Sequence, residues 1–300
     1  FDYNFAKVKG NIYSNQRNHQ AELVLSKENK KAKIDGKDIL KISEYVGYLN
    51  VVVFVPDDLS LVKGSPSTRR KFIDLELSKI SPIYAFYLAK YNRLLKERNQ
   101  YLKLLSKKNG KYDDYLETID EQMVDVQLKV IEKRENFIER LSKNVKDIYK
   151  SIADNEEYVD LHYLCFIKKK DNEELLKLYK KEFSRDLKYL STTHGIHKED
   201  MKIMIDRKSA HQYASQGQQR TIVLSIKIAL LELIKEEIGE YPILLLDDVL
   251  SELDDQRKTK LLDILNNRIQ TFITTTSIDG IEHHVIKEAK KININRKEEQ

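Results

Sequence analysis

Two adjacent carboxylates, Asp247 and Asp248, directly follow an apolar run from Ile243 to Leu246. The run has the composition of a fully buried strand, which would deliver both acids at its carboxyl end. A strand does not require two adjacent acids there, and neighbouring like charges are unfavourable unless a cation or water satisfies them. Mg²⁺ bound by one carboxylate together with nucleotide phosphates is the usual solution. The pattern therefore predicts a magnesium and nucleotide site at the end of this strand.

This segment resembles a Walker B element of ATPases. The resemblance implies that Asp247 holds Mg²⁺, directly or through water, and that Asp248 is the catalytic residue, which orients and polarises the water that attacks the γ-phosphate of ATP. Many ABC ATPases carry Glu at the second position, so the side chain of Asp248 is one methylene shorter and slow hydrolysis is expected. The structural alternative is that the two acids cap a helix N-terminus.

A second candidate is residues 213–220, Tyr-Ala-Ser-Gln-Gly-Gln-Gln-Arg, which precede a strongly helical segment that runs to Ile238. A Ser and a Gly ahead of a helix have an ordinary explanation as N-cap residues. The segment also looks like the ABC signature, Ser-Gly-Gly-Gln in many members, whose Ser hydroxyl and helix N-terminus receive the γ-phosphate of ATP held by the opposite subunit. The nucleotide contacts implied are Ser215, Gln216, Gly217 and Gln218, with Gln216 in place of the first Gly.

Two further segments follow the acids. Ser251-Glu-Leu-Asp254 resembles the D-loop, which communicates across the dimer, so Asp254 is expected beside the nucleotide. Ser251 or Asp254 can equally cap the helix that begins near Asp255, and the two roles can coexist. The Thr-rich end of the next strand leads to Ser277, at the place where ABC proteins carry a switch residue, often His, that contacts the γ-phosphate.

The order and spacing of these segments narrow the class of protein. A signature precedes a helix, the first acid follows the signature Ser, and the D-loop and the Thr-rich strand end come next. The strings Ser-Gln-Gly-Gln-Gln-Arg and Leu-Leu-Leu-Asp-Asp-Val-Leu-Ser-Glu-Leu-Asp are similar to those of the bacterial RecF family, as is the stretch from Phe54 to Arg70. Where that family tends to have Gly-Pro-His-Arg-Asp-Asp, this chain has Gly-Ile-His-Lys-Glu-Asp at residues 195–200. A phosphate or DNA contact carried by that Arg is weaker at Lys198, because an ammonium lacks the bidentate fork of a guanidinium.

The resemblance implies an ATP-dependent homodimer that clamps single-stranded, gapped or junction DNA and helps recombinase loading. It further implies RecR and RecO as partners and roles in recombinational repair, replication support and SOS induction. The alternative class is a structural or adaptor protein in which an ABC-like fold survives without hydrolysis. A transporter ATPase subunit is disfavoured, since the helical insertion described below is far longer than the usual one.

A P-loop is missing from the sequence. Among the nine glycines only Gly36 and Gly110 precede a Lys, and neither pair belongs to a Gly-x-x-x-x-Gly-Lys-Ser/Thr pattern. The family carries this Walker A segment near its start, and the chain opens on Phe1 within strand-like sequence. We therefore expect an N-terminal piece to be missing, the intact protein to bind ATP, and this chain alone to bind ATP poorly and to be inactive.

The elements that must position these residues follow from hydrophobic periodicity. Short alternating runs predict strands up to about residue 56, and breaker-free helical spacing predicts helices over about 82–106 and 112–152 with a hinge at Lys107 to Lys111. From Met201 strand and helix patterns alternate, which predicts a parallel sheet with ligands at the carboxyl ends of its strands. The fold class expected is α/β, an ABC-type ATPase head in which a mixed sheet is flanked by helices, with an inserted helical lobe. Residues 1–64 would form the rest of the N-terminal half of the head, 65–197 the lobe, and 198–300 the C-terminal half with signature, Walker B and D-loop.

Composition sets the remaining bounds. The formal net charge is +5 with 53 basic and 48 acidic residues, which permits nucleic-acid contact without proving it. Arg69, Arg70 and Lys71 could lie along DNA phosphates or be solvated charge, and in the absence of a base-reading motif the binding should be salt-sensitive and largely sequence-independent. No run of 18 consecutive apolar residues occurs, and the single cysteine fits a reducing compartment, so a cytoplasmic protein without a membrane partner is expected.

Overall fold

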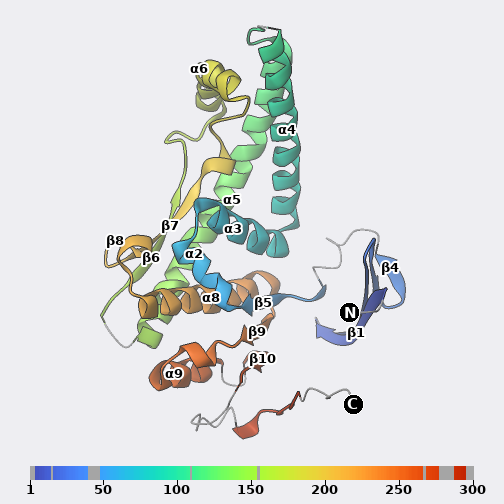
Figure 1. Ribbon diagram of the computed structural model, residues 1–300, viewed down its shortest axis with the longest axis vertical. Helices are drawn as coiled ribbons and strands as arrows, with labels where there is room; N and C mark the ends of the chain where they lie inside the picture. Colours follow the sequence, from blue (N-terminus) through green and yellow to red (C-terminus); the bar gives the residue numbers. More distant parts are fainter. Residues whose placement is uncertain are drawn as a thin grey trace.

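The computed structural model describes residues 4–14, 16–39, 48–108, 110–153, 156–265, 268–276 and 287–294. A helical lobe extends along the longest axis of the molecule, with the small sheets and the signature-bearing helix at its base (Figure 1). The N-terminal strands form a separate sheet at one side of that base.

The N-terminal sheet is antiparallel, in the order β1-β2-β3-β4. Its strands are β1 (Phe5–Ser14), β2 (Arg17–Ser26), β3 (Lys30–Ile34) and β4 (Lys37–Ile39). Asp35 and Gly36 form the turn that joins β3 to β4, and both residues adopt positive φ, +50° and +78°. Hairpin turns with two such residues match the right-handed twist of the strands, which is why Asp-Gly is favoured there.

A parallel three-stranded sheet carries the two acids. It has the order β10-β9-β5, with β9 (Ile243–Asp247) between β5 (Val51–Phe54) and β10 (Thr271–Thr274). Both neighbours run parallel to β9. The parallel pairing predicted from the alternation of strands and helices after Met201 is thus confirmed for β9 and β10, and β5, from the N-terminal part of the chain, joins the same sheet.

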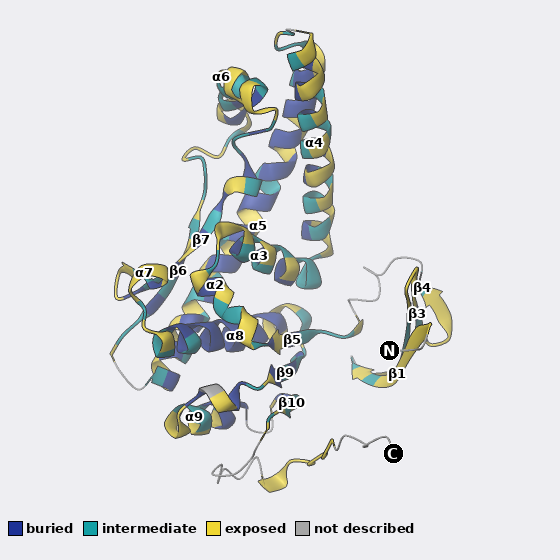
Figure 2. Ribbon diagram, viewed as in Figure 1, coloured by how far each residue is buried: buried dark blue, intermediate teal, exposed yellow. Residues whose placement is uncertain are grey.

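Helix α8 (Gln216–Ile238) is buried on nearly all sides, as expected of a helix that is apolar all round (Figure 2). Lys227 in its middle fastens it to the end of β5: the ammonium donates to the Val53 carbonyl at 2.8 Å and pairs with Asp58 at 2.8 Å. The chain segment Phe54 to Leu59, noted for its similarity to the RecF family, therefore has a structural role beneath the signature helix.

The lobe consists of four helices, and the expected hinge separates its two longest ones. They are α3 (Pro66–Ile80), α4 (Pro82–Lys107), α5 (Asp114–Ala153) and α6 (Asn172–Tyr189). An apolar seam on α5 is buried along its length, with Leu116, Met123 and Val130 all at 0 % exposure. The helical pair is confirmed.

One strand belongs to a different sheet from the one predicted. Residues 202–206 were predicted to begin the parallel sheet, but β7 (Asp200–Ile205) pairs antiparallel with β6 (Val159–Leu164) and with β8 (Lys208–Ser209). The sequence of β7 alternates buried and more exposed residues, the pattern of a strand with one covered face, whereas β9 is a continuous apolar run. This sheet also crosses the boundary placed between residues 197 and 198.

Short elements complete the described chain: α2 (Ser60–Lys63), α7 (Ala210–Tyr213), α9 (Asp255–Leu265) and the 3-10 turns η2 (Pro56–Leu59), η3 (Ile196–Lys198) and η4 (Leu250–Glu252). The alternation of strand and helix patterns also predicts a helix over about residues 279–289, which lies largely outside the described residues. Within the described ranges, every helix is too short or too polar to cross a lipid bilayer.

Candidate functional site

The two acids leave the parallel sheet in different ways. Asp247 is the exposed last residue of β9, while Asp248 turns into the left-handed region at φ +53°. A residue other than Gly is uncommon there, and such strain gathers at functional sites. One carboxylate oxygen of Asp248, Oδ1, is buried without a hydrogen-bond partner among the described residues. Buried acceptors are nearly always satisfied, so this oxygen is a candidate for a ligand, water or ion contact.

Thr274, at the end of β10, fixes both acids. Its hydroxyl donates to Asp247 Oδ1 at 2.5 Å, and its carbonyl and hydroxyl oxygens accept the N–H of Asp248 at 3.1 and 3.2 Å. The sequence analysis identified this Thr-rich strand end but named Ser277 as the residue at the switch position, and Ser277 lies outside the described residues.

The acids do not form the helix cap that was the structural alternative. In the described chain, Val249 occupies the N-cap position of η4 without a side-chain bond. The cap of α9 is Asp254, whose Oδ1 accepts the N–H of Arg257 at 3.0 Å. Both acids therefore remain available at the strand end.

The signature segment begins α8 with a reciprocal capping box. Ser215 Oγ accepts the N–H of Gln218 at 3.2 Å, and Gln218 Oε1 accepts the N–H of Ser215 at 2.7 Å. Ser215 and Gln216 are exposed. The Ser215 hydroxyl accepts in the cap, so its proton remains free to be donated to a ligand.

The amide of Gln218 is bound by protein groups at both its oxygen and its nitrogen. Its Nε2 donates to Glu157 Oε1 at 2.7 Å, so both ends of the side chain bind protein groups. The cap and Glu157 each use one hydrogen-bonding position of this amide, and the role of Gln218 beside a nucleotide stays a prediction. Glu157 was missed by the sequence analysis, which offers no local signal for a partner 61 positions away.

The D-loop segment lies next to the signature of the same chain. Arg257 donates to Asp254 Oδ2 at 2.8 Å, and a side chain at Gly217 would place its Cβ 3.6 Å from the same Arg257 nitrogen. Asp254 thus has the capping role that was open in the sequence, and Ser251 binds the Asp248 carbonyl at 2.7 Å. The role of Asp254 beside a nucleotide stays a prediction.

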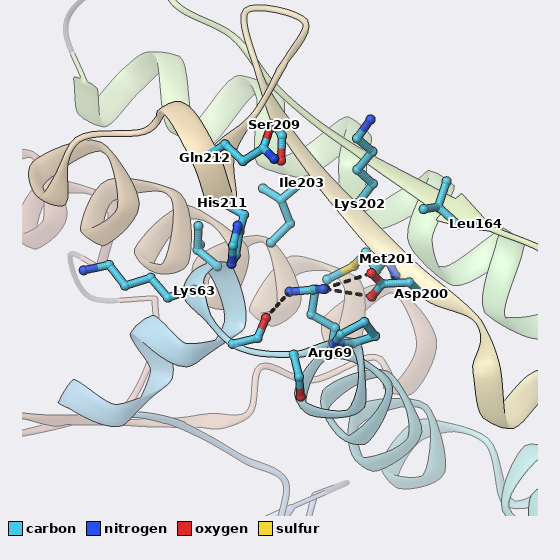
Figure 3. A pocket seen from close by; sticks show the side chains of 14 residues that line it. Lys63, Arg69, Leu164, Asp200, Met201, Lys202, Ile203, Ser209, His211 and Gln212 are labelled. Carbon is cyan, nitrogen blue, oxygen red and sulfur yellow. Dashed lines mark hydrogen bonds and ion pairs between the residues drawn. The ribbon is translucent and has the colours of Figure 1, made fainter.

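The basic candidates separate into buried and exposed groups. Figure 3 shows Arg69 facing Asp200 in the wall of a cavity of about 450 Å³, with bidentate bonds of 2.7 and 2.9 Å. Because the Arg69 side chain is only 10 % exposed and also binds the Gly64 carbonyl, it has a structural role, and its assignment as a DNA contact stays a prediction. Arg70 is half-buried and donates to the Glu199 carbonyl, whereas Lys71 and Lys198 are exposed.

The segment around His197, where the chain departs from the family pattern, is held rigidly. His197 Nε2 lies 2.9 Å from the Thr192 carbonyl and Nδ1 lies 2.8 Å from the Tyr91 hydroxyl, so a neutral ring donates to the first and accepts from the second. Burial lowers the pKa of His197 to about 4. Gly195 has φ +142°, and a Cβ there would lie 2.4 Å from the Tyr91 hydroxyl, so only glycine fits.

Taken together, the parallel strand with two acids, the capped signature helix and the inserted helical lobe define an ABC-type ATPase head. No family model matches the chain. It is 42% identical to the DNA replication and repair protein RecF of Staphylococcus carnosus (strain TM300), over 99% of this chain and 82% of the relative. It is likewise 42% identical to that of Geobacillus sp. (strain WCH70), over 96% of this chain and 79% of the relative. The chain belongs to the RecF family.

Solved structures agree with this assignment. The RecF-ATP structure of the recombination mediator protein in the RecFOR pathway superposes with a TM-score of 0.84 at 35% identity, covering 93% of this chain and 76% of that one. A second RecF structure from the same pathway gives a TM-score of 0.82 with 93% and 77% coverage.

Proposed function

We propose that this protein is an ATP-dependent DNA-binding protein of recombinational repair, which also supports replication and SOS induction. Support comes from relatives named as DNA replication and repair proteins and from a RecF structure with ATP. The partners proposed are single-stranded, gapped or junction DNA, RecR and RecO, the last two on the strength of the RecFOR pathway named for the solved relatives.

The observation that carries the proposal is the pair of acids at the end of β9. Mg²⁺ in nucleotide sites needs one or two protein carboxylates and takes its other ligands from phosphates and water. The exposed carboxylate of Asp247 fits that need, and Thr274 orients it. The unsatisfied Oδ1 of Asp248 supplies an acceptor next to it for the proton of an attacking water. The metal, when bound, offsets the charge of the phosphates.

The signature supports a dimeric arrangement. Ser215 is exposed at the N-terminus of α8, where the helix dipole and unpaired N–H groups favour a phosphate, and its hydroxyl proton is not used by the cap. In our proposal each Ser215 faces the nucleotide of a second copy, so that ATP closes a homodimer around DNA and hydrolysis releases it.

The test is Asp248→Asn in a full-length chain that carries a P-loop ahead of Phe1. The amide cannot accept the proton of water, so hydrolysis should fall by about 10²-fold or more while ATP-dependent dimerisation and DNA retention persist or lengthen. Turnover, sedimentation and DNA dissociation rates measure these effects. Asp255→Asn is the matched control, because Asp255 is an exposed acid with the same change of charge at the start of α9.

Two results would contradict the proposal. If the parent hydrolyses nothing and the variant behaves identically in dimerisation and DNA retention, the non-hydrolysing adaptor becomes the better assignment. If the control loses as much turnover as Asp248→Asn, the effect belongs to the general charge of this region and not to the acid beside the metal.

A further inference from the structure

A chain of hydrogen bonds links the last turn of α5 to the first turn of α8. The hydroxyl of Tyr149, on α5, donates to Glu157 Oε2 at 2.9 Å, and Glu157 Oε1 accepts from Gln218 Nε2 at 2.7 Å. Gln218 in turn closes the capping box with Ser215. Tyr149 is 1 % exposed, and burial raises its pKa, so it stays a protonated donor. We call these three residues, Tyr149, Glu157 and Gln218, the tether.

The segment that carries Glu157 is held from a second side. The Tyr158 N–H donates to Asp206 Oδ1 at 3.1 Å, and its carbonyl accepts the N–H of Asp206 at the same distance. Arg207 donates to the Tyr158 hydroxyl at 2.9 Å. Asp206 and Arg207 form the turn between β7 and β8, with φ of +46° and +63°, and this turn leads through α7 into the signature. Residues 157 and 158 therefore hold both the start of α8 and the chain that enters it.

The other side of the tether is the longest helix of the lobe. With 40 residues, α5 spans about 60 Å, and it runs from the hinge at the far end of the lobe to the base of the molecule (Figure 1). It packs along α8, and Arg140 pairs with Glu236 at 2.9 Å and with Glu237 near the opposite end of that helix. The two helices are thus fastened near both ends of α8, so a displacement of α5 is passed to the signature.

From this geometry we propose that Glu157 is a positioning residue that couples the helical lobe to the signature Ser215. A displacement of the lobe then changes how the signature fits the nucleotide bound by the partner. This inference rests on the proposed function, which gives Ser215 its role. The tether acts through the capping box: because Gln218 is bound at both ends, its amide transmits the position of Glu157 to the backbone of Ser215. Small displacements matter, since an error of about 1 Å in a reacting geometry can cost about 10²-fold in rate.

The decisive variant is Gln218→Glu in the full-length chain. Glutamate at this position keeps the capping box, because its carboxylate accepts the Ser215 N–H as the amide oxygen does. It removes the N–H that Glu157 accepts and sets two carboxylates against each other. Adding Glu157→Gln restores the bond with exchanged roles, since the new amide donates to the new carboxylate and still accepts from Tyr149. Glu156→Gln is the matched control, with the same charge change at the exposed neighbouring position.

Two measurements separate the tether from general stability. Hydrogen exchange of the first-turn amides of α8 should accelerate in Gln218→Glu and return to the parental rate in the double variant. ATP-dependent dimerisation should weaken by about tenfold in the single variant, the worth of one charge-assisted hydrogen bond, and recover in the double variant. ATP binding to the monomer should be unchanged in all of them, because the signature faces the partner's nucleotide.

The outcomes distinguish the two proposals. If the parent and Gln218→Glu dimerise equally well with ATP, the tether is overturned and the proposed function stands. If dimerisation weakens but the double variant does not recover, the effect is local damage and the coupling is likewise overturned. A parent that forms no ATP-dependent dimer overturns the proposed function, and the role of Glu157 with it.

Discussion

Single residues in this molecule often serve structure and chemistry with the same atoms. Ser215 caps α8 through a lone pair of its hydroxyl oxygen and keeps the hydroxyl proton, which is what a phosphate acceptor needs. Gln218, three residues further into the same motif, binds the Ser215 N–H through its oxygen and Glu157 through its nitrogen. Residues that match one motif therefore differ in which of their side-chain atoms are already bound by the protein itself.

Ser215 gives a prediction at this scale. Ser215→Ala removes the cap and should cost about 1 kcal/mol in the free energy of unfolding, measured by urea denaturation. Ser215→Asp keeps a cap that the helix dipole favours, so stability should stay within about 0.5 kcal/mol of the parent. The carboxylate would repel a γ-phosphate, so ATP-dependent dimerisation of the full-length chain should be lost. Normal dimerisation of Ser215→Asp would mean that Ser215 is only a cap.

At the level of secondary-structure elements, the segment from Thr192 to Asp200 is bound by side chains from two helices of the lobe, α3 and α5. Arg134 of α5 donates to the Ile196 carbonyl at 2.8 Å and pairs with Glu199 at 3.2 Å, and Arg69 of α3 pairs with Asp200. Breaking a buried pair by removing one partner leaves an uncompensated charge and is strongly destabilising. The segment therefore locks α3, α5 and β7 together at the base of the lobe.

The pH dependence of stability tests this lock at His197. Its pKa is about 4 in the folded chain and 6.5 ordinarily, so between these values the unfolded state binds a proton that the folded state does not. Its contribution is complete above pH 6.5 and is lost as the pH falls to 4, by about 3 kcal/mol. His197→Gln should remove this dependence, measured as the difference in urea stability between parent and variant from pH 7 to 4. Burial raises the pKa of Glu199 to about 7, so Glu199 makes the folded state more stable as the pH falls. It does so in the parent and in His197→Gln alike, and its effect cancels in the difference.

A difference between parent and His197→Gln that stays constant across this range would show that His197 titrates normally. Burial would then not keep the ring neutral.

For the whole molecule, the lobe and the signature helix behave as one packed body, because α5 is buried against α8 and tethered near both ends of it. The exposed ammonium groups of Lys71 and Lys198 lie near the base of the lobe, on α3 and at the end of η3. Phosphate contacts from such groups release counterions and make binding depend on salt.

DNA binding by the full-length protein with ATP should depend on these two lysines. Lys71→Gln and Lys198→Gln should each weaken binding uniformly across sequences and lower the slope of log affinity against log salt concentration by about 1. Fluorescence anisotropy on gapped DNA at several salt concentrations measures the slope. Lys33→Gln, on β3 of the N-terminal sheet, is the control for a lost exposed charge. If all three variants and the parent give equal slopes, Lys71 and Lys198 do not contact DNA phosphates.

The sequence by itself determined the helices of the lobe, the hinge between α4 and α5, and the strand that presents Asp247 and Asp248. These features follow from local periodicity, turn residues and the covalent order of the motifs, all of which can be read within a few residues. The capping role of Ser215 was also predictable, since a capping box spans three positions.

Only the tertiary structure decided which side chains are committed elsewhere. Arg69 is paired with Asp200, 131 positions away, and Gln218 is bound to Glu157. The antiparallel pairing of β6 with β7 likewise joins two strands that are separated in the sequence by the whole of α6. Charge and hydrogen-bond partners are chosen by proximity in space, and proximity between distant segments is set by the packing of the whole chain, which local patterns do not encode.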